Sequence, residues 1–391
     1  NHRDTPLQPT SHPVKEQIQE NTIATSGCRG CRRGGGESAG GWWWLVAWMR
    51  MMGTDSVAYH EQAVVLRMED PVGPSLDYYA SRGETPMMWG GAGAAELGLE
   101  GEVALADWRA IFGTGGASDP TSGRRLVACK RPGMELVVSP HKSVAELGVI
   151  GRAEDMHAIV DAERNATLGY LDRLVRQEGG RRGRAMTRTP TGGLIWAASR
   201  HATTRAGDPQ VHDHVLVANL VSMRDARGGW KGLDTGFLRD HLHAATAVGR
   251  MASAAKAVEL GYGIEADGGP SGRLGGWAIS GIPRQAWEIH ATRSAQIDAA
   301  VGVEATYRER SVAARATRDR KTHEQSENLV GRWRAELTQA GFPPLDLAHA
   351  VRLAGVEYQR PAMEVLDGLA EQLLAPEGRL ARRPRPSPRA T

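Results

Sequence analysis

The chain has 391 residues, of which 41% are hydrophobic, so it can bury one large core or two smaller ones. Its formal net charge of +3 is too small to indicate a partner by itself. Three cysteines in a chain of this length exclude a disulfide framework and indicate a reducing compartment, which we expect to be the cytoplasm. No Gly-x-x-x-x-Gly-Lys-Ser/Thr phosphate loop occurs, which excludes hydrolysis of nucleoside triphosphates by that route.

The first 50 residues are rich in glycine and arginine, and we expect them to be a disordered or non-native extension. Their apolar run, Trp42–Met49, is too short to span a bilayer, so we expect no membrane insertion. Met51 or Met52 is the expected natural start. The folded part of the chain is therefore expected to begin at residue 51.

Two adjacent tyrosines, Tyr78 and Tyr79, stand in a segment that we expect to be helical. Neighbouring positions on a helix point about 100 degrees apart, so only one of the two rings can face a given site. Taken alone, the pair would be assigned to the core, because aromatic residues dominate core burial.

An acidic residue, Glu135, interrupts the apolar run Met134–Val138, which reads as a strand. A carboxylate in such a strand is costly to bury without a partner.

A glycine-rich connection further along the chain contains several arginines. They are Arg176, Arg181, Arg182, Arg184 and Arg188. Such a loop can follow a phosphate backbone, although most charge runs are merely solvated.

Three histidines surround one predicted hairpin. Leu194–Arg200 reads as a strand, and Gly207–Pro209 supplies turn residues before a second strand. His212 and His214 are two residues apart and therefore share a face, and His201 is expected to end the first strand opposite them. Three imidazoles on one face can bind a divalent metal and leave coordination positions open.

The remainder of the chain reads as mainly helical. A long helix is expected over 238–260, ended by Gly261, followed by a strand around Trp277 and a helix with Pro283 in its first turn. A last helical stretch begins at about residue 345. The sequence ends in an arginine- and proline-rich segment that we expect to be disordered.

Four separated blocks, in order, give the chain a family resemblance. They are Trp89–Gly101, Gly133–Val144, Ser199–His214 and Trp230–Asp234. With these blocks the chain resembles the conjugative relaxases of the TrwC and TraI type, called MobF, within the HUH endonuclease superfamily. Four ordered blocks make coincidence improbable.

The resemblance implies a two-layer α/β fold, with a central, mainly antiparallel sheet, helices packed on it and a helical C-terminal subdomain. We expect a relaxase domain over 51–300, a helical extension over 301–375 and a disordered basic tail over 376–391.

The resemblance also implies the chemistry. A tyrosine oxygen would attack a phosphodiester of single-stranded DNA and form a 5′-phosphotyrosine, with Tyr79 favoured over Tyr78. Glu135 would act as the base, or would accept a hydrogen bond from a ligand imidazole and so fix its tautomer. Many relatives carry Asp at this position. The metal ligands would be His201, His212 and His214.

The expected cofactor is a divalent metal, magnesium or manganese, with zinc and nickel as alternatives and no nucleotide. Single-stranded DNA at a transfer origin is the expected partner, together with accessory relaxosome proteins and type IV secretion coupling proteins. The residues expected to contact DNA are Arg181, Arg182, Arg184, Lys142 and Arg205.

Two alternatives stay open. The chain could be a catalytically inactive DNA-binding module, as Glu135 and the single tyrosine pair suggest, or a three-histidine hydrolase that activates water. Tyr59 is the upstream candidate for a second tyrosine, and it does not align cleanly. Asp213 replaces the apolar residue usual between the two histidines, and strand alternation predicts that it faces away from the metal.

Overall fold

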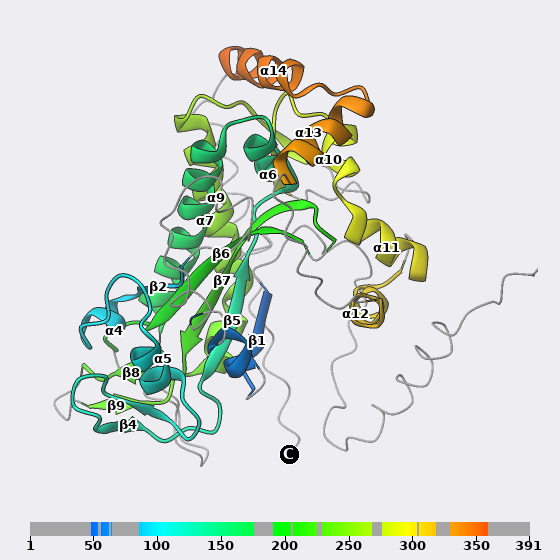
Figure 1. Ribbon diagram of the computed structural model, residues 1–391. Helices are drawn as coiled ribbons and strands as arrows, with labels where there is room; N and C mark the ends of the chain where they lie inside the picture. Colours follow the sequence, from blue (N-terminus) through cyan, green and yellow to red (C-terminus); the bar gives the residue numbers. More distant parts are fainter. Residues whose placement is uncertain are drawn as a thin grey trace, which may run out of the picture.

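A central five-stranded sheet organises the molecule (Figure 1). The computed structural model describes residues 48–53, 56–61, 64, 86–175, 191–204, 206–224, 229–267, 276–302, 305–317 and 329–358. In spatial order, the strands are β1 (Trp48–Met51), β5 (Gly133–Val138), β7 (Pro209–Ala218), β6 (Trp196–Thr203) and β2 (Met88–Gly90). Every neighbouring pair is antiparallel, which confirms the expected fold class.

The predicted hairpin is β6–β7. Its turn contains Gly207, whose φ of +80° lies in the left-handed region that favours glycine. The first strand begins two residues later than expected and continues to Thr203. His201 therefore lies within β6 and not at its end, because pairing with β7 continues past it.

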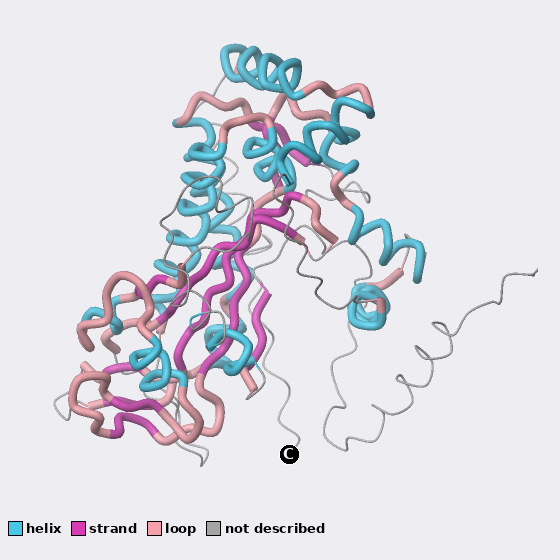
Figure 2. The backbone as a smooth tube through the Cα atoms, in the orientation of Figure 1, coloured by secondary structure: helices cyan, strands magenta, loops and turns pink. Residues whose placement is uncertain are grey.

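Two long helices cover one face of the sheet. α7 (Ala153–Leu174) and α9 (Leu242–Glu259) run side by side in Figure 1, and Figure 2 shows both beside the strands. Leu168 and Leu171 of α7 share one apolar cluster with Leu136 of β5 and Val215 of β7. The strands supply alternate residues to this cluster, as their two-residue period requires.

Among the residues that the structure describes, an apolar cluster covers one end of the opposite face. There α5 (Leu105–Phe112) places Trp108 and Phe112 in a cluster with Ala197 and Leu216, and Val57 of the helical residues 56–61 joins it. Small elements lie near this end; they are α4 (Ala92–Ala95), β3 (Ala117–Ser118), β4 (Arg125–Val127), β8 (Val221–Ser222) and β9 (Trp230–Lys231). The histidines of β6 and β7 lie on this same face of the sheet.

A third apolar cluster lies at the far end of the sheet. It joins α6 (Lys142–Val149), α10 (Arg284–Ile289), α13 (Leu329–Gln339) and α14 (Pro344–Glu357). The small sheet of β10 (Ile264–Asp267) and β11 (Gly276–Ile279) contributes to it. α11 (Thr292–Val301) and α12 (Tyr307–Ala316) complete the described helices.

Most expectations for this C-terminal part are confirmed, with one correction. The strand at Trp277 is β11, and the expected helices are α10 and α14. The long helix is two helices, α8 (Thr235–Asp240) and α9, because the backbone leaves the helical conformation at His241. There Nδ1 of His241 lies 2.8 Å from the carbonyl oxygen of Phe237 and competes for a helical acceptor.

The expected boundary at residue 50 is wrong. Residues 48–50 belong to β1, which pairs with β5 at the edge of the sheet. Residues 1–47 and the expected tail at 376–391 lie outside the described residues, and the divisions at 300 and 375 stay predictions. Within the part of the chain that the structure describes, no helix is both long and apolar enough to cross a membrane.

Candidate metal centre

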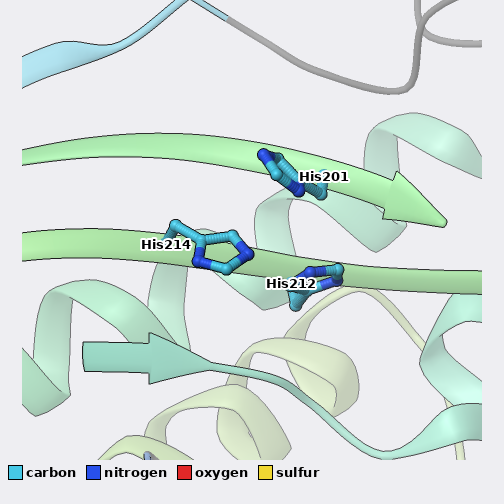
Figure 3. Close-up of side chains that lie close together, drawn as sticks. All are labelled: His201, His212 and His214. Atoms are coloured by element: carbon cyan, nitrogen blue, oxygen red, sulfur yellow. The ribbon is translucent and has the colours of Figure 1, made fainter. Parts of the chain in front are cut away.

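The structure brings His201, His212 and His214 together on one face of the β6–β7 hairpin (Figure 3). His201 lies directly opposite His212 in the strand register. One ring nitrogen from each histidine lies within 4.8 Å of the other two. Nitrogens that share a tetrahedral ion lie about 3.4 Å apart for metal–nitrogen bonds of about 2.1 Å, so small ring rotations make this cluster a ligand set.

The hydrogen bonds around the rings fit a metal site. Nδ1 of His214 lies 2.6 Å from Oε1 of Glu135, and Nδ1 of His212 lies 2.8 Å from the carbonyl oxygen of Gln210. If each Nδ1 carries the proton and donates it, each Nε2 keeps its lone pair for a metal. The donor set of three neutral imidazoles suits zinc, nickel and other first-row divalent ions.

Glu135 is buried, with 1% of its surface exposed, and both of its oxygens are engaged. Oε1 accepts the bond from His214, and Oε2 accepts one of 2.6 Å from Nε of Arg50. Nε2 of His60 lies 3.8 Å from Oε1. Burial alone would raise the pKa of Glu135, but the contacts with His214 and His60 outweigh it and hold the pKa well below its usual range.

Sequence reasoning missed Arg50 and His60. Arg50 lies opposite Glu135 in the β1–β5 register, inside the segment expected to be an extension. His60 is buried, with its ring 6.1 Å from that of His214 and 6.4 Å from that of Trp108. No spacing in the sequence links either residue to Glu135, since the link is made by strand pairing and helix packing.

Asp213 faces away from the histidines, as strand alternation predicts. It accepts two hydrogen bonds from Arg200, at 2.7 and 2.8 Å, and one from Arg164 of α7 at 3.1 Å. Arg200 also binds Asp161, at 2.7 Å. This partly buried ionic network ties both histidine-bearing strands, β6 and β7, to α7 on the reverse face of the sheet.

Lys142 does not lie on the surface as a DNA contact would. It is 6% exposed, and its Nζ donates a hydrogen bond of 2.7 Å to the carbonyl oxygen of Pro209. Burial lowers the pKa of Lys142 to about 8, against the opposing charges of Asp208 and Glu146. The burial of Lys142 and its bond to Pro209 argue against a role in DNA binding.

The other expected site residues have no described position. Tyr78, Tyr79, Arg181, Arg182, Arg184 and Arg205 all lie outside the described residues. Tyr59 is described; it is 40% exposed, and its ring meets that of His60 edge-on at 5.1 Å.

An antiparallel sheet with three clustered histidines and a buried carboxylate on one face defines an α/β domain with a candidate metal site. The family model described as TrwC relaxase matches residues 53–340, and the chain belongs to the TrwC relaxase family. The resemblance inferred from the four sequence blocks is thereby confirmed.

Curated relatives agree with this membership. The chain is 32% identical over 284 residues to the multifunctional conjugation protein TraI of Escherichia coli, and equally so to that of strain K12. Each match covers 68% of this chain and 15% of the relative. The matched part of the chain thus spans about 15% of the length of these relatives.

Solved structures share the fold. A metal-bound conjugative relaxase TrwC in complex with OriT DNA has a TM-score of 0.61 at 22% identity, covering 76% of this chain and 99% of that one. A copper-bound complex of TrwC with OriT DNA has a TM-score of 0.59 at 24% identity, with the same coverage. At these identities the likeness establishes the fold alone.

Proposed function

We propose that the chain is a conjugative DNA relaxase, which nicks single-stranded DNA at a transfer origin and rejoins it through a 5′-phosphotyrosine. The observation that carries this proposal is the three-histidine cluster, whose ligand nitrogens lie within 4.8 Å of one another in a chain of this family. The covalent adduct retains the phosphodiester energy, so resealing needs no ATP. The metal-bound TrwC structure with OriT DNA supports the same substrate class.

His201, His212 and His214 would hold a divalent metal. When bound, such an ion acts as a Lewis acid that polarises the scissile phosphate and offsets charge in the in-line transition state. Magnesium or manganese is proposed for the cell, while imidazole ligands favour zinc, nickel or copper by affinity.

Glu135 is assigned to orienting His214, not to acting as the base. Its Oε1 is bonded to His214 and its Oε2 to Arg50, each at 2.6 Å, and this pairing supports a role in holding the imidazole. The contacts with His214 and His60 lower the pKa of Glu135 and so keep it ionised as a hydrogen-bond acceptor. Orientation of a ligand imidazole by a carboxylate is a common device at metal sites.

Tyr79 is the proposed nucleophile, with Tyr78 as the second choice. A phenol has a pKa near 10, so the attacking tyrosine would lose its proton to a nearby base or through the field of the metal. The P–O bond that breaks would release the upstream strand with a free 3′-hydroxyl. Arg181, Arg182, Arg184 and Arg205 are proposed to bind the DNA backbone. Accessory relaxosome and type IV coupling proteins, and a cytoplasmic location, complete the proposal.

Adduct formation tests this function. The chain is incubated with manganese and labelled single-stranded oligonucleotides from the element's own transfer region, and an SDS-resistant protein–DNA band is measured. We expect a band that disappears in the Tyr78→Phe/Tyr79→Phe double variant and in His212→Ala. Tyr59→Phe serves as the matched control and should keep the band.

Other outcomes select the alternatives. Cleavage without a covalent band would point to water as the nucleophile and to a three-histidine hydrolase. Binding of a verified nick sequence without cleavage would favour the inactive DNA-binding module. An adduct that persists in the double variant and is lost in Tyr59→Phe would move the nucleophile to Tyr59.

A further inference from the structure

The β6–β7 hairpin ends in a turn closed by two backbone hydrogen bonds, from the N–H of Thr204 to the carbonyl oxygen of Asp208 at 2.9 Å and from the N–H of Gly207 to that of Thr204 at 3.1 Å. Regular pairing between β6 and β7 reaches His201 opposite His212, and the register then shifts before Thr203 pairs with Pro209. Pro209 has no N–H group and cannot donate to the ladder. These local bonds shape the turn, and its position relative to the rest of the fold depends on contacts from outside the hairpin.

Side chains from two helices supply these contacts. From α13, Nε1 of Trp333 and Nη2 of Arg332 both donate to the carbonyl oxygen of Gly207, at 2.9 and 2.6 Å. From α6, Nζ of Lys142 donates to the carbonyl oxygen of Pro209, at 2.7 Å. A Cβ atom at position 207 would lie 2.9 Å from Nη2 of Arg332, so a larger residue there would displace the end of this arginine side chain.

A third helix, α11, adds a fourth contact. Oγ1 of Thr292 donates a hydrogen bond of 2.8 Å to Oδ1 of Asp208, which is buried in the turn. Three consecutive turn residues are thus each bound from outside the hairpin. The helices that supply these contacts are far from the turn in the sequence. Figure 1 shows the upper ends of β6 and β7 near α6 and α13.

The helix that carries Trp333 and Arg332, α13, is itself packed against α6. Trp333 and Leu337 of α13 lie in the same apolar cluster as Leu147 of α6. Nε of Arg334 donates a hydrogen bond of 2.7 Å to the carbonyl oxygen of Val149 at the end of α6. The two helices therefore act as one support, and the turn is fixed against the core of the C-terminal part.

Gln210 links the fixed turn to the proposed metal site. Pro209 is followed by Gln210, whose carbonyl oxygen lies 2.8 Å from Nδ1 of His212 and whose side chain donates to Oγ of Ser139 at 2.9 Å. A shift of the turn would move the acceptor that orients the His212 ring. Ligands held in place before binding lower the ordering cost that the metal must overcome.

We propose that Trp333 and Arg332 of α13, with Lys142 of α6, are positioning residues that hold His212 ready for the metal. The inference rests on the proposed metal site and adds α13 to it, although the sequence assigned this helix to a separate extension. α13 lies at the C-terminal end of the family match, which ends at residue 340.

Metal titration of the full chain without DNA tests this inference. Manganese or zinc binding is measured by calorimetry for the wild type and for Trp333→Phe, which keeps a ring and loses the N–H donor. Loss of one such hydrogen bond is expected to raise the dissociation constant about threefold to tenfold. Thermal unfolding of the metal-free protein checks that each variant is folded.

Trp277→Phe is the matched control. Trp277 packs against the same apolar cluster, and its Nε1 also donates to a backbone carbonyl, that of Arg250, at 3.1 Å. That bond does not involve the hairpin, so metal affinity should be unchanged.

Arg332→Gln gives a variant on the surface, where folding is not at risk. Arg332 is half-exposed, and its loss should weaken metal binding less than the double variant Trp333→Phe/Arg332→Gln does. Equal metal affinity in the wild type, Trp333→Phe and the double variant would overturn the inference, as would equal weakening by Trp277→Phe. A wild-type chain that binds neither metal would instead overturn the metal site itself, and the inference with it.

Discussion

At the scale of single residues, Glu135 explains how an acid can occupy an apolar strand. The carboxylate is buried, and its desolvation is offset by Arg50 on one oxygen and His214 on the other. The same two bonds hold it as the hydrogen-bond acceptor of His214, one of the three proposed metal ligands. The strand position and the negative charge of Glu135 thus both serve to orient the His214 ring.

Replacing Glu135 with Gln should weaken metal binding about 10-fold to 100-fold, the usual effect of losing a partner behind a ligand histidine. An amide has a single acceptor oxygen and cannot serve both His214 and Arg50. Calorimetric metal titration measures the effect. Glu96→Gln, which removes a carboxylate paired with Arg224 at 2.6 Å, is the control and should bind metal normally. Unchanged metal affinity with a loss of cleavage rate in Glu135→Gln would instead make Glu135 the base.

At the scale of elements, α6 begins with a buried cation. Its N-cap is His141, whose side chain accepts a hydrogen bond from the backbone N–H of Ser143. Lys142 follows at the first helical position, where the helix dipole also disfavours positive charge. Burial and the dipole both act against the ammonium, while its bond to Pro209 ties α6 to the hairpin turn.

Stability should therefore rise with pH through the titration of Lys142. Its pKa is about 8 in the folded chain and 10.5 in the reference state, so the unfolded chain binds more protons between these values. Across this window the unfolding free energy of the wild type should increase relative to Lys142→Met, by on the order of 2–3 kcal/mol. Urea unfolding at pH 7.5 and pH 10 measures this difference. Lys231→Met, at an exposed lysine on β9, should show no such change, and a difference that falls with pH would contradict the assignment.

At the scale of the whole molecule, the C-terminal helices share a core with the sheet-proximal helices. Leu337 of α13 and Leu347 of α14 lie in one cluster with Leu147 and Ile159 of α6 and α7. A single cluster of this kind predicts that the described parts of 142–358 unfold cooperatively.

Leu337→Ala should lower the unfolding free energy by about 2–5 kcal/mol, because Leu337 is fully buried. Leu345→Ala is the matched control; Leu345 is 84% exposed on α14, and its loss should cost less than about 0.5 kcal/mol. Both are measured by urea unfolding followed by circular dichroism and tryptophan fluorescence. A separate early transition in Leu337→Ala would show that residues after 300 form an independent unit.

The sequence alone was sufficient for features that depend on local period and turn chemistry. Alternation placed His212 and His214 on one face, with Asp213 on the other, and turn residues at 207–209 brought His201 opposite them. The antiparallel hairpin, the strand containing Glu135 and the helices α9, α10 and α14 follow from the same short-range rules. These features are set by a residue's immediate neighbours, so their signals are visible along the chain.

The tertiary structure decided which distant groups meet. Arg50 reaches Glu135 because β1 pairs with β5, and His60 does so because its helix packs beside Trp108. Lys142 is drawn inward to Pro209, and Trp333 reaches Gly207, because α6 and α13 share a core at the end of the hairpin. The hydrogen bonds of Lys142, Arg50 and Trp333 join residues that are 67, 85 and 126 positions apart in the sequence. No local period encodes them, since each depends on how whole elements pack.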